Sequence, residues 1–110
     1  MTNAENVIAD FPATAAERDV LAERRRQIEA GHTPEHDDRH HEAGELASAA
    51  MCYARSAAFG ATGALPPFWP WSSQHWKPSD PRRDLVKAGA LILAEIERID
   101  RAEAQKGSEA

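Results

Sequence analysis

Apolar residues recur every three or four positions in three stretches of the chain, which is the spacing of one buried helix face. The last stretch, 81–104, repeats most clearly, with Leu85, Ala88, Ile92, Ile96 and Ile99. The middle stretch, 38–59, uses smaller side chains, namely Leu46, Ala50, Tyr53, Ala54 and Ala57. The first, 14–30, has only a thin stripe of Val20, Leu21 and Ile28. No stretch alternates with a period of two, so the pattern predicts an all-α fold, a small bundle of three main helices.

Local signals mark where these helices begin and end. Thr14 and Glu17 have the spacing of a capping box, in which each side chain accepts from the other's backbone N–H. Gly31 is suited to a left-handed exit from the first helix. Asp80 followed by Pro81 is a strong start for the third helix. We expect the second helix to begin near Asp38 and end before Gly60, and the third to end near residue 104.

Residues 60–80 predict a long ordered loop between the second and third helices. The segment contains four prolines and two glycines, which forbid a long helix, and all three tryptophans of the chain. Connections of this length in a compact domain are often functional. The chain thus divides into an N-terminal arm (1–13), one helical domain (14–104) and a flexible tail (105–110).

Size and charge narrow the classes of function. A chain of 110 residues buries a modest core, so we expect a homo-oligomer. The net charge of −5 disfavours extended nucleic acid as a partner. Cys52 is the single cysteine, which rules out an internal disulfide. Neither a signal peptide nor an apolar run long enough to cross a membrane is present, so we expect a cytoplasmic protein with no membrane partner.

Histidines and acids are dense between His32 and Glu45, which is typical of divalent-metal sites. With a helix starting near Asp38, Glu42 and Glu45 would project from one face as metal ligands. An alternative is a polar helix N-terminus, where acids complement the helix dipole and histidines face water. Both interpretations stay open from the sequence.

Arg82 and Arg83 lie at the start of the third helix, with Lys87 one turn later. Two arginines oppose the helix dipole there, so an anion is expected beside them. That anion is either a ligand phosphate or an internal carboxylate. Trp76 beside Lys77 is a candidate for stacking on a base, although tryptophans of such a loop can equally cover the core. The candidate ligand-binding residues are Arg82, Arg83, Lys87, Trp76, Arg24, His36 and His40.

Several motifs together resemble a family of small phage and prophage accessory proteins. They are Glu23-Arg-x-Arg-Gln27, Thr33-Pro-Glu-His-Asp-Asp38-x-His40, Gly44-Glu-Leu-Ala47, Trp69-Pro-Trp71, Trp76-Lys-Pro78, Pro81-Arg-Arg-Asp-Leu-Val-Lys87 and Ala94-Glu-Ile-Glu-Arg98. The resemblance implies a mobile-element protein acting in a bacterial host cell. Such proteins often counter host defence, for example by sequestering nucleotide immune signals or by blocking a CRISPR effector.

A second resemblance is to MazG-like nucleotide pyrophosphohydrolases, all-α oligomers that hold magnesium on paired acidic motifs. Glu42-x-x-Glu45 and Glu97-x-x-Asp100 match those motifs in form. This resemblance implies magnesium-dependent hydrolysis, in which the metal activates water.

We therefore expect, first, a protein that binds a nucleotide-like phosphorylated small molecule, with no obligatory chemical reaction. The alternatives are the magnesium-dependent pyrophosphohydrolase and an inhibitor that binds a host defence protein, such as an anti-CRISPR.

Overall fold

The computed structural model describes residues 11–109, so most of the predicted N-terminal arm lies outside the described residues. Four α-helices and one short 3-10 helix make up this part of the chain. They are α2 (Ala15–Glu29), α3 (Pro34–His40), α4 (Glu45–Phe59), η1 (Ser73–His75) and α5 (Pro81–Glu109). Residues 11–109 contain no strand, and the predicted all-α fold is confirmed.

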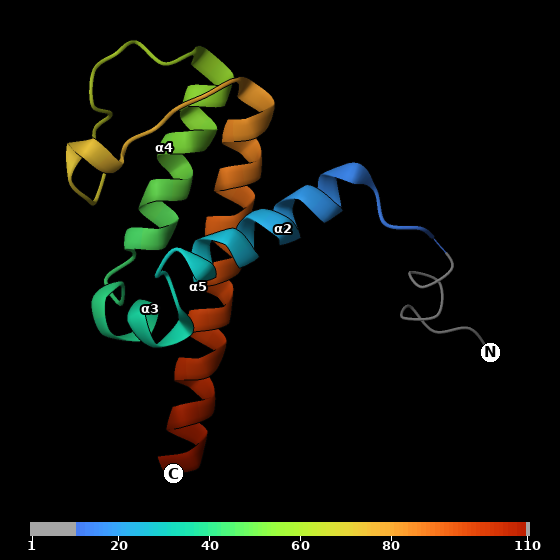
Figure 1. The fold of residues 1–110 in the computed structure, drawn as a ribbon. Coiled ribbons are helices and arrows are strands. Elements are labelled where there is room, and N and C mark those ends of the chain that lie inside the picture. Colours follow the sequence, from blue (N-terminus) through green and yellow to red (C-terminus); the bar gives the residue numbers. More distant parts are fainter. Residues whose placement is uncertain (1–10, 110) are drawn as a thin grey trace.

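The helices α4 and α5 form an antiparallel pair, and α2 crosses α5 at a steep angle (Figure 1). The short helix α3 also lies against α5. The loop between α4 and α5 carries η1 and runs along the side of α4. Residues of α2, α3, α4, α5 and this loop together line one cavity.

The core is built from small residues, as the alanine-rich middle helix predicts. Its buried cluster comprises Leu46, Ala49, Ala50, Tyr53, Ala88, Leu91 and Ala94. Trp69, Trp71 and Trp76 pack against this cluster while staying partly exposed. The short side chains let α4 and α5 approach closely, and the tryptophans supply the apolar volume that the alanines lack.

The crossing of α2 over α5 is close at Gly89. A Cβ atom at this position would lie 3.2 and 3.3 Å from the two methyl carbons of Val20. Those distances are tighter than ordinary van der Waals contact, so a larger residue at this position would require the Val20 side chain to shift.

The predicted second helix is wrong at its start, because the chain forms two helices there, α3 and α4, separated by a break at residues 41–44. Thr33 caps α3 by accepting a hydrogen bond from the His36 N–H, and Pro34 occupies the first helical position. The break at residues 41–44 ends with Gly44 in the left-handed region, with φ of 89°. An N-cap followed by proline is a separate helix start that the expected boundary at Asp38 overlooked.

The predicted end of the third helix is also wrong. The helix α5 continues to Glu109, so residues 105–109 are helical rather than an irregular tail. Glu103 and Lys106 form an ion pair across one turn, with 3.7 Å between Oε1 and Nζ, which supports this extension.

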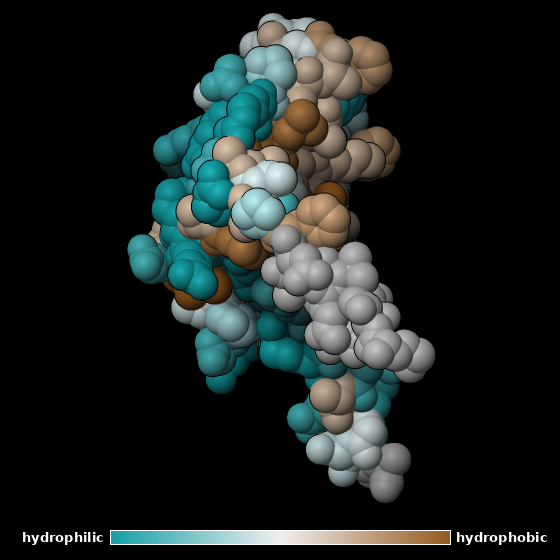
Figure 2. Space-filling model, turned by 90° about the vertical axis from the view of Figure 1, so that its right-hand side faces the viewer, coloured by the Kyte–Doolittle hydropathy of each residue, from teal (hydrophilic) through white to brown (hydrophobic). Residues whose placement is uncertain are grey.

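Part of the apolar pattern of α5 remains on the surface. Leu85, Ile92, Ile96 and Ile99 are each about half exposed, as is Leu21 of α2. Hydrophobic side chains are also visible among the hydrophilic surface in Figure 2. Within residues 11–109 no helix is both long enough and apolar enough to span a bilayer.

Candidate functional site

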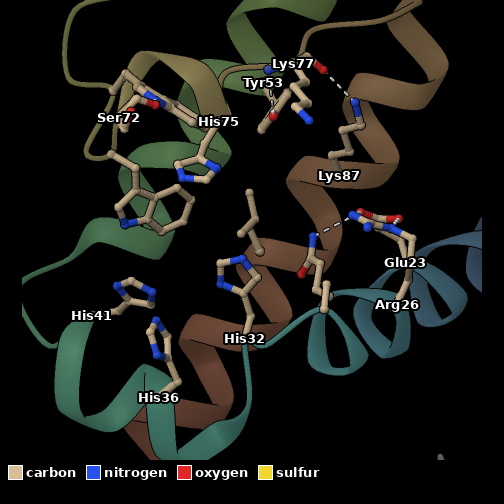
Figure 3. A pocket seen from close by; sticks show the side chains of 15 residues that line it. Glu23, Arg26, His32, His36, His41, Tyr53, Ser72, His75, Lys77 and Lys87 are labelled. Carbon is tan, nitrogen blue, oxygen red and sulfur yellow. Dashed lines mark hydrogen bonds and ion pairs between the residues drawn. The ribbon is translucent and has the colours of Figure 1, made fainter.

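A cavity of about 640 Å³ lies between the end of α2, α3, the α4–α5 pair and the loop. This volume is within the range of pockets that bind small molecules. Its lining divides into histidines, aromatic rings and charged groups (Figure 3). The three sets come from segments far apart in the sequence, so the fold assembles the site.

His32 reaches the cavity because of how α2 ends. Gly31 adopts φ of 114°, the His32 N–H donates to the Gln27 carbonyl, and the Gly31 N–H donates to the Ile28 carbonyl. This pair of hydrogen bonds is a Schellman motif, and it confirms the predicted left-handed exit at Gly31. The motif reverses the chain and turns His32 toward α3.

His36 and His41 come from α3 and its C-terminal cap. Their ring centroids are 4.8 Å apart, and one nitrogen from each of His32, His36 and His41 lies within 4.8 Å of the other two. Burial, and then the neighbouring imidazoles, lower the pKa of His32 and of His41. A neutral imidazole is the form that can accept a proton or ligate a metal.

Ion pairs behind the histidines hold α3 in place. Arg24 of α2 lies 3.6 Å from the Asp37 carboxylate and donates through Nε to Glu97 at 3.0 Å. Arg101 of α5 donates to both oxygens of Asp38. The helix carrying His36 is thus tied to both α2 and α5.

The aromatic side of the cavity is formed by Tyr53, Trp69 and Trp71. Trp69 packs edge-on against Tyr53 and Trp71, with centroids 5.7 and 5.4 Å away. The Trp71 ring lies 5.0 Å from His41, which joins the aromatic and histidine sides. Mutual packing fixes these rings, so they present a rigid apolar surface to a ligand.

The charged side of the cavity carries more positive than negative groups. Arg26, Lys77 and Lys87 line it, against Glu23 alone among acidic residues in the lining. The Lys87 ammonium donates to the Lys77 carbonyl at 2.7 Å and lies 5.3 Å from the Tyr53 ring centroid. Burial lowers the pKa of Lys87.

Glu23 is almost fully buried, and two arginines neutralise it. Arg26 binds it through two hydrogen bonds of 2.7 Å, and Arg83 donates to the same carboxylate. Burial raises the pKa of Glu23, but the hydrogen bonds and charges of Arg26 and Arg83 outweigh it and lower the pKa overall. Because Arg26 and Arg83 already neutralise the Glu23 carboxylate, its negative charge does not offset the positive charges of Lys77 and Lys87.

The predicted anion-binding arginines lie beside the cavity and not in its lining. Arg82 donates to Asp19 at 2.8 Å on the surface, and Arg83 binds Glu23. Internal carboxylates, one of the two alternatives from the sequence, therefore occupy both guanidinium groups. Lys87, predicted with them, does line the cavity.

Of the other predicted ligand-binding residues, one lines the cavity and the rest lie outside its lining. His36 lines the cavity, whereas Arg24 is buried outside the lining, where it pairs with the buried Asp37 and the exposed Glu97. Trp76 packs on Tyr53 at 4.8 Å and is absent from the lining. His40 is exposed and its ring lies tilted against that of His36, with 4.7 Å between the centroids.

The predicted acidic metal ligands are not brought onto one helix face. Glu42 lies in the break before α4, and Glu45 is the first residue of α4, where its carboxylate accepts from the Ala43 N–H. Glu97 is engaged by Arg24. In residues 11–109, the one group of three or more potential ligands within metal-binding distance is His32, His36 and His41.

Sequence reasoning missed several members of the site. His32 and His41 were part of the histidine-rich segment, but the expected helix boundary hid their convergence. Tyr53 reads as a core residue, and His75 carries no local signal. The Thr33-Pro34 pair and Gly44 were the available clues, because the pair marks the start of a short separate helix and Gly44 marks the break before the next one.

No protein-family model, curated protein or solved structure matches this chain. The chemistry of the cavity is therefore the basis for assigning a function.

Proposed function

We propose that the protein binds a phosphorylated, nucleotide-like small molecule in this cavity. The observation that carries the proposal is the excess of cationic groups in an aromatic-walled pocket of a chain whose net charge is −5. Cations gathered at a concave site in an otherwise acidic protein favour an anionic ligand.

The two sides of the cavity suit the two halves of such a ligand. Lys77 and Lys87 lie on the side opposite His36 and His41 and can donate to phosphate oxygens (Figure 3). A planar base can pack on the exposed parts of Trp69 and Trp71, and stacking of this kind contributes about 1–3 kcal/mol per base. The distance between the tryptophan rings and the lysine ammonium groups would then set the orientation of the bound nucleotide.

Calorimetric titration tests the proposal, using ATP, AMP, cyclic di-AMP and inorganic pyrophosphate as probes in the presence of EDTA. We expect at least one nucleotide to bind more tightly than pyrophosphate, because only the nucleotide uses the aromatic wall. The variant Lys77→Gln/Lys87→Gln should weaken that binding by about 10-fold or more, since hydrogen bonds to charged groups contribute roughly 1.5–3 kcal/mol.

Arg82→Gln is the matched control, because Arg82 is a cation of the same helix as Lys87 but pairs with Asp19 outside the lining. Its affinity should equal that of the unmodified protein. Absence of binding to every probe, or full affinity in the lysine variant, would contradict the proposal.

The resemblance to phage accessory proteins supports a biological role for this binding, namely sequestration of a host nucleotide immune signal in the bacterial cytoplasm. Tight binding of cyclic di-AMP relative to ATP would support that role. Magnesium-dependent hydrolysis receives less support, because Arg24 pairs with Glu97 and the Glu45 carboxylate accepts a hydrogen bond from the Ala43 N–H. Binding to a host defence protein stays a prediction.

We also propose that the protein is a homo-oligomer that pairs through α5. Leu85, Ile92 and Ile99 are exposed at seven-residue spacing along this helix, as in the seam between paired helices. A second copy of the chain presents the same apolar residues. Packing of the two α5 helices about a two-fold axis would bury the residues of both copies against each other.

A further inference from the structure

Three imidazole side chains converge on one point at the floor of the cavity. His32 follows the Schellman turn of α2, His36 lies on α3, and His41 caps α3. Figure 3 shows the three rings facing one another across a small gap. Their potential ligand nitrogens all lie within 4.8 Å of one another.

Three buried nitrogens of this cluster lack hydrogen-bond partners. His41 is 5% exposed, yet neither its Nδ1 nor its Nε2 is bonded. The buried Nδ1 of His32 is also without a partner. Buried polar atoms in folded proteins are nearly always satisfied, so three unpaired imidazole nitrogens in one place indicate a missing ligand.

We propose that His32, His36 and His41 bind a transition-metal ion of the zinc class. Three imidazole donors favour Zn²⁺, Co²⁺, Ni²⁺ or Cu²⁺ over the oxygen-seeking Mg²⁺ and Ca²⁺. At zinc–nitrogen distances of about 2.0–2.1 Å, tetrahedral ligands lie roughly 3.3 Å apart. The nitrogens here lie up to 4.8 Å apart, so metal binding requires the side chains of His32 and His36, which are only half-buried, to rotate inward.

Asp37 provides the negative charge that such a site uses behind its ligands. Its carboxylate is fully buried, has no hydrogen bond, and acts electrostatically on both His36 and His41. Metal-binding histidines commonly donate their second nitrogen to a carboxylate, which fixes the ring and strengthens ligation. Once the metal occupies one ring nitrogen of His41, an N–H on its other ring nitrogen could donate to the Asp37 carboxylate. Both the imidazole and the carboxylate would then be satisfied.

Three protein ligands leave a tetrahedral ion with one open coordination position. In this fold the cluster lines the cavity, so that position is accessible to water or to a small ligand. The metal site uses imidazoles alone, and the phosphorylated ligand is proposed on the lysines and aromatic rings. The metal site could therefore be disproved without disproving the proposed binding of a phosphorylated ligand, and the reverse also holds.

Cobalt titration tests the site directly. The full chain, freed of metal by chelator and dialysed, is titrated with Co²⁺ while visible absorption is recorded, and Zn²⁺ is then added in competition. We expect one ion per chain, a d–d spectrum typical of nitrogen ligands in tetrahedral or five-coordinate geometry, and displacement by Zn²⁺. Loss of one ligand, in His36→Ala or His32→Ala, should weaken Co²⁺ binding by about 10- to 100-fold or more.

His40→Ala is the matched control, since His40 lies on the same helix beside His36 but outside the cluster. Its affinity should be unchanged, as should that of Lys77→Gln/Lys87→Gln. Circular dichroism verifies that each variant is folded, and His32→Ala serves if His36→Ala unfolds. Failure to bind Co²⁺ or Zn²⁺, undiminished binding in both folded ligand variants, or equal loss in His40→Ala would overturn the proposal.

Discussion

Arg24 and Asp37 form an ion pair that is almost completely withdrawn from solvent. Their side chains are 5% and 0% exposed, and Nη2 of the arginine lies 3.6 Å from Oδ2 of the aspartate. Burial raises the pKa of Asp37, and the charge of Arg24 opposes that rise. The pair joins α2 to the helix that carries His36, so it links the stability of the fold to the geometry of the site.

Removing the arginine alone should therefore be costly. Arg24→Met leaves Asp37 buried without its partner, and we expect a loss of about 3–5 kcal/mol in the free energy of unfolding at pH 7. The double variant Arg24→Met/Asp37→Asn should recover much of this loss, since no charge then remains buried. Urea denaturation followed by circular dichroism measures both. Equal losses in the single and double variants would show that the pair does not act as a unit.

Glu23 should make stability depend on pH. Its pKa in the folded protein is lowered by Arg26 and Arg83 against the opposing effect of burial. A lowered folded pKa means that the stabilisation is complete above the unfolded value of about 4.3 and is lost as the pH falls through the folded pKa. Glu23→Gln should cost about 1.5–3 kcal/mol at pH 7 and progressively less below about pH 4.

Urea denaturation between pH 7 and pH 3 measures this difference. Glu29→Gln is the control, because Glu29 is an exposed glutamate at the end of the same helix. That variant should differ little from the unmodified protein at any pH. A Glu23→Gln deficit that stays constant down to pH 3 would rule out the electrostatic explanation.

Asp84 should be a second sensitive position, because it joins α4, the loop and α5. Its oxygens accept hydrogen bonds from Ser56 Oγ at 3.0 Å and from the Ser79 N–H at 2.7 Å, and it is 1% exposed. Asp84→Ala leaves both donors unpaired, which should cost about 2–4 kcal/mol in thermal or urea unfolding. Ser56→Ala removes one donor and should cost less. The reverse order would be inconsistent with this arrangement.

Self-association should respond to charge on the exposed stripe of α5. A monomer has a mass of 12.1 kDa, and light scattering coupled to size-exclusion chromatography should give a larger value for the unmodified protein. Ile92→Glu/Ile96→Glu should shift the mass to that of the monomer, because burying glutamates in an apolar interface is unfavourable. Arg55→Glu, at an exposed position of α4, is the control. A monomeric unmodified protein would end the proposal.

The sequence predicted those parts of the fold that depend on neighbours in the chain. The reciprocal hydrogen bonds of Thr14 and Glu17 and the Asp80 side chain accepting from the Arg83 N–H are both present. Each is decided within one helical turn, where residue preferences are strong.

The candidate site was harder to predict, because it depends on how helices cross. Whether Arg83 faces a ligand or Glu23 is set by contact between residues 60 positions apart. The burial of His41 depends on Trp71 of the loop, which no local pattern relates to α3. Histidine density indicated metal chemistry, but choosing among five histidines required the turn at Gly31 and the break at Gly44.

The short length of α3 affects the fraction of molecules in which the cavity is fully formed. A helix of seven residues is too short to persist by itself, so its order depends on its attachment to α2 and α5. Release of this segment would disperse His36 and His41 while the α4–α5 pair stayed intact. The apparent affinity of the cavity would then equal its intrinsic affinity scaled by the fraction of molecules with α3 docked. Amide hydrogen exchange in residues 34–41 would report that fraction, and an occupied cavity would slow it selectively.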